Sequence, residues 1–223
     1  MSCKEIDDFL RSLRKSPSGA VFNPWWEVDE ENDIARAAPI IRRQQLRAYL
    51  QERLGSAKVA VIGEAVGYRG GHFSGIPMTS ERMLLGKQPV ILAGIKPCRT
   101  SKPSFCPDGF SEPTATIVWA ALLQHRLKPD QFVLWNAFPW HSFDSHRGML
   151  SNRMPNKSEQ AAGLPALKAF LELFSCDQVI ALGKIAAAQL QKLGVNAHSV
   201  RHPASGGARL FRQQIAKIVN RLT

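Results

Sequence analysis

Residues 58–80 read "KVAVIGEAVGYRGGHFSGIPMTS", an apolar β-branched run followed by a stretch that holds five glycines and a single carboxylate. A short apolar run of this kind is typical of a buried strand. Glycine lets the backbone approach a ligand closely and leaves amide N–H groups exposed to it. The stretch therefore predicts a buried strand that ends in a ligand-binding loop.

The glycine spacing argues against a dinucleotide-binding site. Such a site requires Gly-x-Gly-x-x-Gly running directly into a helix, with an acidic residue about 20 positions later. Here the spacing differs, and the segment "GGHFSGIPMTS" (70–80) is loop-like rather than helical. If the loop binds a ligand of another kind, further ligand-binding groups are expected at the ends of other predicted strands.

Apolar β-branched runs alternate with helical patterns along the chain, which predicts a parallel sheet covered on both faces. We expect a three-layer α/β/α sandwich around a central, mainly parallel four-stranded sheet. The predicted strands are 59–63, 132–136, 179–183 and 199–201, and a further strand could occupy 89–95. The predicted helices are 39–54, 114–127, 158–174, 184–193 and 208–222.

Length and composition fit one α/β domain over residues 1–223. No apolar stretch is long enough to span a membrane, and the N-terminus carries acids where an export signal needs an apolar core. Four irregularly spaced cysteines suit a reducing cytoplasm. We therefore expect a cytoplasmic protein, and we expect it to be a monomer.

The net charge of +11 favours partners with a phosphate backbone. A solvated basic surface that binds no nucleic acid is an equally good interpretation of charge alone. Cys98 and Cys106 lie in a Pro- and Lys-rich stretch without a Cys-x-x-Cys pair or paired histidines. We accordingly predict no metal and no cofactor.

Polar residues follow two more of the predicted strands. Asn136 ends the run "QFVLWN", and His202 follows the last strand in "VRHPASGG" (200–207). A carboxamide can both accept and donate, as the edge of a nucleobase requires. Ligands of parallel sheets bind outside the carboxyl ends of the strands, so the glycine loop, Asn136 and His202 should converge there. Taken singly, each of the two residues could instead be a turn residue.

In this order and strand context, the motifs resemble those of the uracil-DNA glycosylase superfamily, from about residue 57 to the end. The resemblance implies an insertion at 82–112 and leaves residues 1–56 as an N-terminal helical extension. The segment "GEAVG" is similar to the first motif of its thermophile-type branch, and "GIPMTS" to the Gly-x-Pro-Phe segment that follows. The other similar segments are "NAFP" (136–139), "NRMPNKSE" (152–159), "VIALGKIAAAQL" (179–190) and "HPAS" (202–205). The resemblance implies a metal-free DNA base-excision enzyme that hydrolyses the N-glycosidic bond of a flipped-out base, most simply uracil.

The chain departs from the family pattern at several positions. Ala65 stands where the best-known branch has a water-positioning Asp, and Val66 and Met78 replace the motif Pro and the stacking Phe. Trp140 and Gly163 stand where the thermophile-type branch has two of its four iron–sulfur cysteines. The resemblance therefore implies no cluster in this chain and leaves the water-activating group open.

The resemblance also implies roles for individual residues. His202 would stabilise the leaving base and Glu64 is the candidate for activating water. The base would be held by Gly63, Ala65, Phe73, Met78 and Asn136, and the DNA backbone by Ser80, Ser205, Gly206, Gly207 and Arg209.

Two alternatives remain open at this stage. A catalytically weak or inactive lesion-binding member of the same superfamily fits the missing Asp at Ala65 as well as Val66 and Met78. A small-molecule nucleobase or nucleotide enzyme could use the same pocket. It would bind DNA weakly and almost independently of salt, whereas phosphate contacts make binding fall steeply as salt rises.

Overall fold

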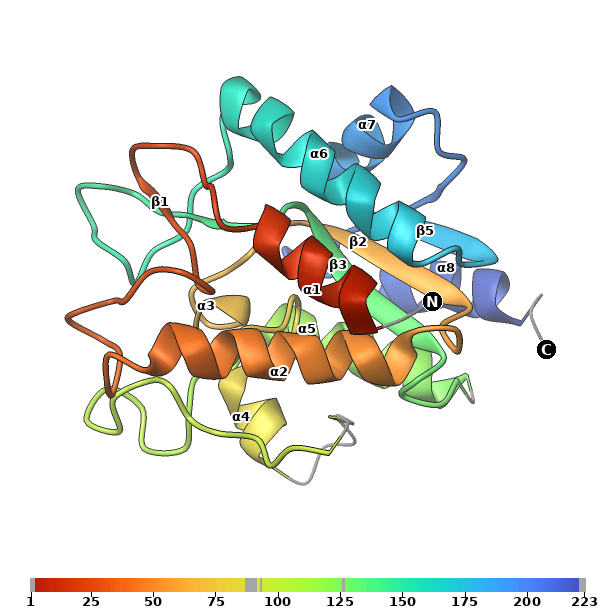
Figure 1. Ribbon diagram of the computed structural model, residues 1–223. Coiled ribbons are helices and arrows are strands. Elements are labelled where there is room, and N and C mark those ends of the chain that lie inside the picture. The colour runs from red at the N-terminus through yellow and green to blue at the C-terminus, as the bar shows by residue number, and fades with distance from the viewer. Residues whose placement is uncertain (1–2, 87–91, 93, 126, 221–223) are drawn as a thin grey trace.

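A four-stranded parallel sheet forms the centre of the protein, in the order β3-β2-β5-β6 (Figure 1). The computed structural model describes residues 3–86, 92, 94–125 and 127–220. The strands are β2 (Val59–Ala65), β3 (Phe132–Phe138), β5 (Gln178–Leu182) and β6 (His198–Val200). β2 pairs with both β3 and β5, and β6 pairs with β5 at the edge. The predicted parallel sheet is thereby confirmed.

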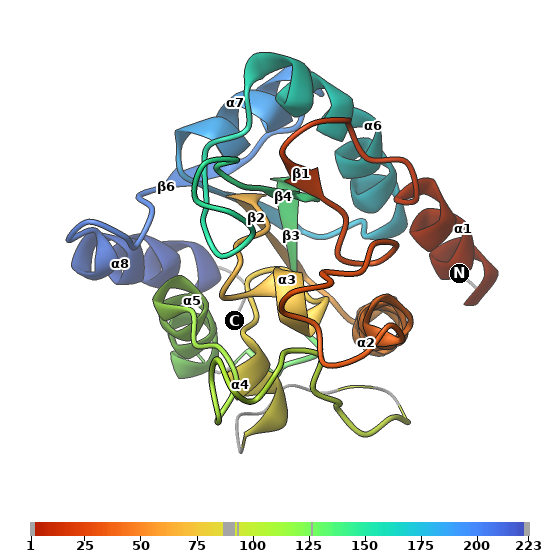
Figure 2. The same cartoon turned by 90° about the vertical axis from the view of Figure 1, so that its left-hand side faces the viewer.

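Helices cover both faces of this sheet, which makes the three layers that we expected. Figure 2 shows α6 and α7 on one side and α2, α5 and α8 on the other. Their bounds are α2 (Ala38–Arg53), α5 (Pro113–Gln124), α6 (Lys157–Leu173), α7 (Lys184–Lys192) and α8 (Ala208–Val219). Helix α1 (Cys3–Ser12) packs against α2 and α6 at the flank. None of the helices in the described part of the chain is both long and apolar enough to cross a membrane.

The sequence analysis missed several short elements. These are the antiparallel pair β1 (Val21–Phe22) and β4 (His141–Ser142), with helices α3 (Gly71–Ser74) and α4 (Glu81–Leu85). The loop that we expected at 70–80 therefore contains one helical turn, which ends at Gly75 with a φ of +73°. Two-residue strands and single turns carry too little periodicity to be recognised in a sequence. The possible strand at 89–95 falls largely outside the described residues.

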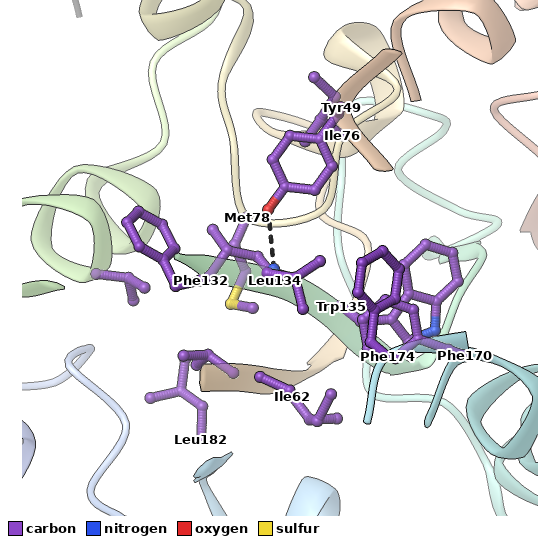
Figure 3. Packing of buried hydrophobic residues seen from close by; sticks show 14 of the residues in the cluster. Tyr49, Ile62, Ile76, Met78, Phe132, Leu134, Trp135, Phe170, Phe174 and Leu182 are labelled. Carbon is purple, nitrogen blue, oxygen red and sulfur yellow. Dashed lines mark hydrogen bonds between the residues drawn. The ribbon is translucent and has the colours of Figure 1, made fainter. Parts of the chain in front are cut away.

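The core lies on both faces of β3. On one face the Leu134 backbone N–H donates a 2.8 Å hydrogen bond to the Tyr49 hydroxyl oxygen (Figure 3). On the other face Trp135 stacks on Phe170 of α6, with ring centroids 5.0 Å apart. The Tyr49 and Trp135 side chains are fully buried. These contacts fix the position of β3 between α2 and α6. They thereby also fix the position of Asn136 near the carboxyl end of the strand.

A buried histidine pair holds the segment 70–80 in place. His72 Nδ1 lies 2.9 Å from His141 Nδ1, and His72 Nε2 lies 3.1 Å from Asp29 Oδ2. Burial lowers the pKa of His141 to about 3, so this ring is neutral and one of the two facing nitrogens carries the proton. In addition, Trp25 donates from Nε1 to the Gly75 carbonyl at 2.8 Å. The N-terminal segment thus supports the glycine-rich loop directly.

The expected insertion at 82–112 is tied to the rest of the fold by a buried carboxylate. Glu81 is fully buried, and its Oε1 accepts from the backbone N–H groups of Thr100 (2.7 Å) and Ser101 (3.0 Å). Ser101 also forms an isolated bridge with Asp33 of the N-terminal segment. The described part of this stretch is therefore packed against α4 and the N-terminal segment.

Gly163 tests the close packing of α6 on β3. A Cβ at this position would lie 2.7 Å from the Ala137 carbonyl oxygen and 3.2 Å from the Phe138 Cα. We expect Gly163→Val to lower the free energy of unfolding by about 1–3 kcal/mol, because the backbone of β3 must move to admit the side chain. Urea denaturation measures this change.

The matched control is Ala162→Val, at the exposed neighbouring position of the same helix. It changes helix propensity but meets no strand, so it should cost about 0.5 kcal/mol or less. Equal losses for the two variants would contradict the close approach of helix and strand.

Candidate functional site

Three residues that the sequence analysis selected come together at the carboxyl end of β2 and β3. The parallel register pairs Gly63 with Asn136. A Cβ on Gly63 would lie 2.5 Å from Asn136 Oδ1 and 3.1 Å from Met78 Sδ. Glycine is therefore required at 63 for the amide and the thioether to occupy this space. We call Gly63, Met78 and Asn136 the Asn136 cluster.

The Asn136 side chain is buried without a partner in the described part of the protein. Its residue exposure is 1%, and neither Oδ1 nor Nδ2 forms a hydrogen bond with any described residue. Burying an amide in this way costs roughly 1–3 kcal/mol unless something else satisfies it. A buried donor and acceptor side by side are suited to a ligand that offers the complementary pair.

The backbone of Met78 is held in a strained conformation. Its φ is +47°, in the left-handed region that a residue with a Cβ rarely adopts. The Met78 carbonyl accepts from Trp119 Nε1 at 3.2 Å, and Trp119 is itself buried in α5. Strain of this kind persists where the surroundings impose it, and here it holds the thioether over Gly63.

His202 and Glu64 line one cavity of about 370 Å³ on the other side of the β2 end. We call it the His202 cavity. A Cβ on Gly183 would lie 3.6 Å from the His202 Cβ, so the histidine sits directly over the end of β5. The cavity is lined by Glu64, Leu182, Gly183, Lys184, Ala187, Ser199, Val200, Arg201 and His202.

The His202 ring is oriented to donate from Nε2. Its Nδ1 accepts from the Ala204 backbone N–H at 3.1 Å, so in the neutral ring the proton is on Nε2. Burial, helped by the charge of Arg201, holds the pKa of His202 below its usual range. Burial also raises the pKa of Glu64 above its usual range. At neutral pH the cavity therefore contains a neutral imidazole whose Nε2–H can donate a hydrogen bond to a ligand.

The Asn136 cluster and the His202 cavity flank the carboxyl end of β2. Gly63 and Glu64 are consecutive, and successive residues of a strand face opposite sides of the sheet. Gly63 faces the carboxamide, whereas Glu64 lines the cavity with His202. A ligand that touches both groups must therefore lie across the end of β2.

Three other residues that the sequence predicted as base or DNA contacts interact with other parts of the fold. Phe73 is fully buried and stacks on Phe110, with ring centroids 4.7 Å apart. Ser80 is fully buried and accepts from the Met83 N–H at 3.4 Å, which caps α4. Ala65 is half-buried and pairs with Phe138 in the sheet. The hydroxyl and the ring thus already have partners within the chain.

The loop after His202 leads into α8 and carries the other predicted DNA contacts. Ser205 and Gly206 are exposed and have positive φ values of 52° and 76°. Gly207 is buried, donates its N–H to the Ala204 carbonyl, and has no room for a Cβ because of the His202 carbonyl. Arg209 is exposed in the first turn of α8. Exposed loop groups and Arg209 are therefore available to a phosphate backbone, whereas Gly207 shapes the loop.

The positions of the family's iron–sulfur ligands do not suit a cluster here. Trp140 is buried and donates to the Leu13 carbonyl at 3.1 Å, and Gly163 packs against the backbone of β3. Neither residue offers a thiolate. Within the described ranges, no group of three or more His, Cys, Asp or Glu side chains is arranged to hold a metal ion.

Sequence reasoning missed two residues near the glycine-rich loop, Glu112 and Asn152. Both lie within 4 Å of a Cβ built on Gly67. Glu112 immediately precedes the proline that opens α5, at the end of the expected insertion at 82–112. Only the folded chain brings it to the first motif.

An α/β/α sandwich with a polar site at the carboxyl edge of a parallel sheet is a frequent arrangement for ligand-binding and catalytic proteins. The family model of the uracil DNA glycosylase superfamily matches residues 53–220. The chain therefore belongs to this superfamily.

The crystal structure of wild-type Pedobacter heparinus SMUG2 has a similar fold, with a TM-score of 0.66 and 15% sequence identity. The match covers 99% of this chain and 96% of that one. No curated protein matches the sequence.

Replacing Asn136 by an apolar side chain of similar shape tests whether its amide lacks partners. We expect Asn136→Leu to leave the free energy of unfolding unchanged or to raise it by up to about 2 kcal/mol, because no protein hydrogen bond is lost. Urea denaturation of the ligand-free protein measures it.

Asn23→Leu is the matched control. Asn23 is also fully buried, but its Nδ2 donates to the Leu13 carbonyl at 2.8 Å and its Oδ1 accepts from the Trp25 N–H at 3.2 Å. It should lose about 1–3 kcal/mol. A similar loss for Asn136→Leu would mean that the Asn136 amide is bonded within the protein.

Proposed function

We propose that this protein is a monofunctional DNA glycosylase that removes a flipped-out damaged base, most simply uracil, by hydrolysing its N-glycosidic bond. The observation that carries the proposal is the buried Asn136 amide, which no described residue satisfies. Superfamily membership supports the reaction class. The protein would act as a monomer in the cytoplasm, on DNA, without a metal or other cofactor.

Base recognition would depend on the Asn136 cluster. Asn136 Oδ1 accepts from uracil N3–H and Nδ2 donates to uracil O4, whereas cytosine presents the opposite polarity at both positions. Met78 covers the face of the base with its polarisable thioether. Extruding the base from the duplex costs a few kcal/mol, which contacts to the DNA backbone must offset.

Stabilisation of the leaving base would depend on His202. As the bond breaks, negative charge grows on uracil O2, and the Nε2–H of a neutral imidazole can donate to it. Backbone N–H groups near Ala65 add further donors in this proposal. The Glu64 carboxylate shares the cavity with His202 and can stabilise the cationic sugar across the end of β2.

Contacts to the DNA backbone are proposed for Ser205, Gly206 and Arg209, which are exposed next to His202. The net charge of +11 favours such an encounter. Gly207 would contribute through the shape of the loop. Ser80, which is buried and caps α4, would contribute only through the local fold.

A lesion-binding protein without catalysis is the second candidate. Ala65 favours it, because this position offers no carboxylate for water. A panel of strands with uracil, hypoxanthine, xanthine or thymine lesions separates the two functions. Base release supports the glycosylase, whereas tight lesion binding without release supports the second candidate.

His202→Ala tests the leaving-group role. We expect the single-turnover rate of base release to fall about 100- to 1,000-fold, because one donor to the developing charge is lost. DNA affinity, measured by fluorescence anisotropy, should change little. His146→Ala, at an exposed loop position, is the control and should keep the wild-type rate.

Asn136→Asp tests base recognition. An ionised Asp offers only acceptors, so we expect uracil release to fall at least about 100-fold and any remaining activity to shift towards cytosine. The measurement compares release from strands that carry uracil or cytosine at one position. Uracil release at the wild-type rate would remove Asn136 from the site.

A further inference from the structure

Glu112 places a buried carboxyl oxygen beside the first motif. The residue precedes α5, and its Oε2 is inaccessible to solvent and has no hydrogen-bond partner among the residues that the structure describes. A carboxylate in this condition costs more to bury than an amide. The helix end does not explain it, because the Glu112 side chain forms no cap hydrogen bond with α5.

The carboxyl group lies directly against the glycine-rich loop. A Cβ on Gly70 would clash with Glu112 Oε2, and a Cβ on Gly67 would lie 3.8 Å from Oε1. Both glycines follow Ala65 within five residues. The loop therefore has room for this carboxyl group because Gly70 lacks a side chain, whereas a Cβ on Gly67 would make only an ordinary contact.

Glu112 also lines a cavity of about 370 Å³ together with the first loop. Its lining residues are Gly67, Tyr68, Arg69, Glu112, Pro113, Thr114 and Asn152. Asn152 Oδ1 accepts from the Tyr68 N–H at 3.0 Å, which fixes the loop on that side. A polar cavity of this size readily holds water.

The charged and titratable surroundings of Glu112 are sparse. From the loop, Tyr68 and Arg69 line the cavity, and Arg69 donates from Nε to the Tyr68 hydroxyl at 2.8 Å. From α5 and from the segment before α6, the lining residues Pro113, Thr114 and Asn152 carry no charge. Burial is the cause that raises the pKa of Glu112 to about 7.

We propose that Glu112 is a catalytic residue that accepts a proton from the water attacking the sugar. This inference rests on the glycosylase function proposed above. The bond between C1′ and the base nitrogen breaks, and its electron pair leaves with the base. The water oxygen bonds to C1′, and the water proton passes to the Glu112 carboxylate. The base anion then takes a proton from solvent, and Glu112 returns its proton to solvent.

Glu112 thus supplies, from the start of another helix, the carboxylate that Ala65 lacks. A general base is most effective when its pKa lies near the working pH. The ionised form is the base, so the rate should rise with pH up to about 7 and then level off. His202 would titrate at lower pH than Glu112, because burial holds its pKa below the usual range.

The test is the single-turnover rate of base release between about pH 5.5 and about pH 9, on the lesion that the wild type cleaves fastest. We expect Glu112→Gln to lose about 100- to 1,000-fold above pH 7 and to lack the rising limb. Glu112→Asp should keep the limb at a reduced rate. Glu64→Gln should keep the limb as well, which separates the two carboxylates.

Stability distinguishes this role from a structural one. A carboxyl group with a raised pKa in the folded state destabilises the fold as pH rises from about 4.5 to about 7, because ionisation is easier in the unfolded chain. Glu112→Gln should therefore be at least as stable as the wild type at pH 8. Glu172→Gln, at a position 67% exposed, is the control and should match the wild type in rate, limb and stability.

Each result decides the proposal. A Glu112→Gln protein that keeps the limb and stays within about threefold of the wild-type rate would overturn the role of Glu112 and leave the glycosylase function standing. A lower rate with an unchanged limb and reduced stability would show a structural role instead. A wild type that releases no base from any lesion would overturn the glycosylase function and this inference together.

Discussion

The pairing of Gly63 with Asn136 across β2 and β3 is the constraint on which the rest of the site depends. The register sets the carboxamide against a position without a side chain, and a Cβ there would lie 2.5 Å from Asn136 Oδ1. The amide is buried and has no hydrogen-bond partner among the described residues, so its burial lowers the free energy of unfolding. Met78 is held over the same glycine by Trp119, with its backbone in the left-handed region.

The costs to stability gather around the first loop. Asn136, Met78 and Glu112 each break a rule of stable packing, and each lies beside a glycine of the stretch 63–70. By contrast, the buried histidines His72 and His141 near the same loop are fully bonded and hold it in place. Unpaired polar groups and strained backbone are expected at functional sites, where well-bonded neighbouring residues hold them in place. This contrast distinguishes the groups that are suited to bind a ligand from the groups that stabilise the fold.

The sequence predicted the sheet and its five main helices because their periodicity and β-branched runs are local properties. It also selected Gly63, Asn136 and His202, because residues at the carboxyl ends of parallel strands share one edge. It could not predict that Phe73 and Ser80 are buried in structural contacts, or that Glu112 reaches Gly70. Those facts depend on packing between segments far apart in the chain. Likewise, the tautomer of His202 is set by the Ala204 N–H, which only the folded loop reveals.

The central claim is that one base lies across the end of β2 and contacts both flanking groups. A crystal structure of the protein with free uracil tests it most directly. The account predicts that the Asn136 amide bonds to N3–H and O4, while His202 Nε2 donates to O2 of the same molecule. Uracil bound elsewhere, or held with either side chain out of hydrogen-bond reach, would contradict it.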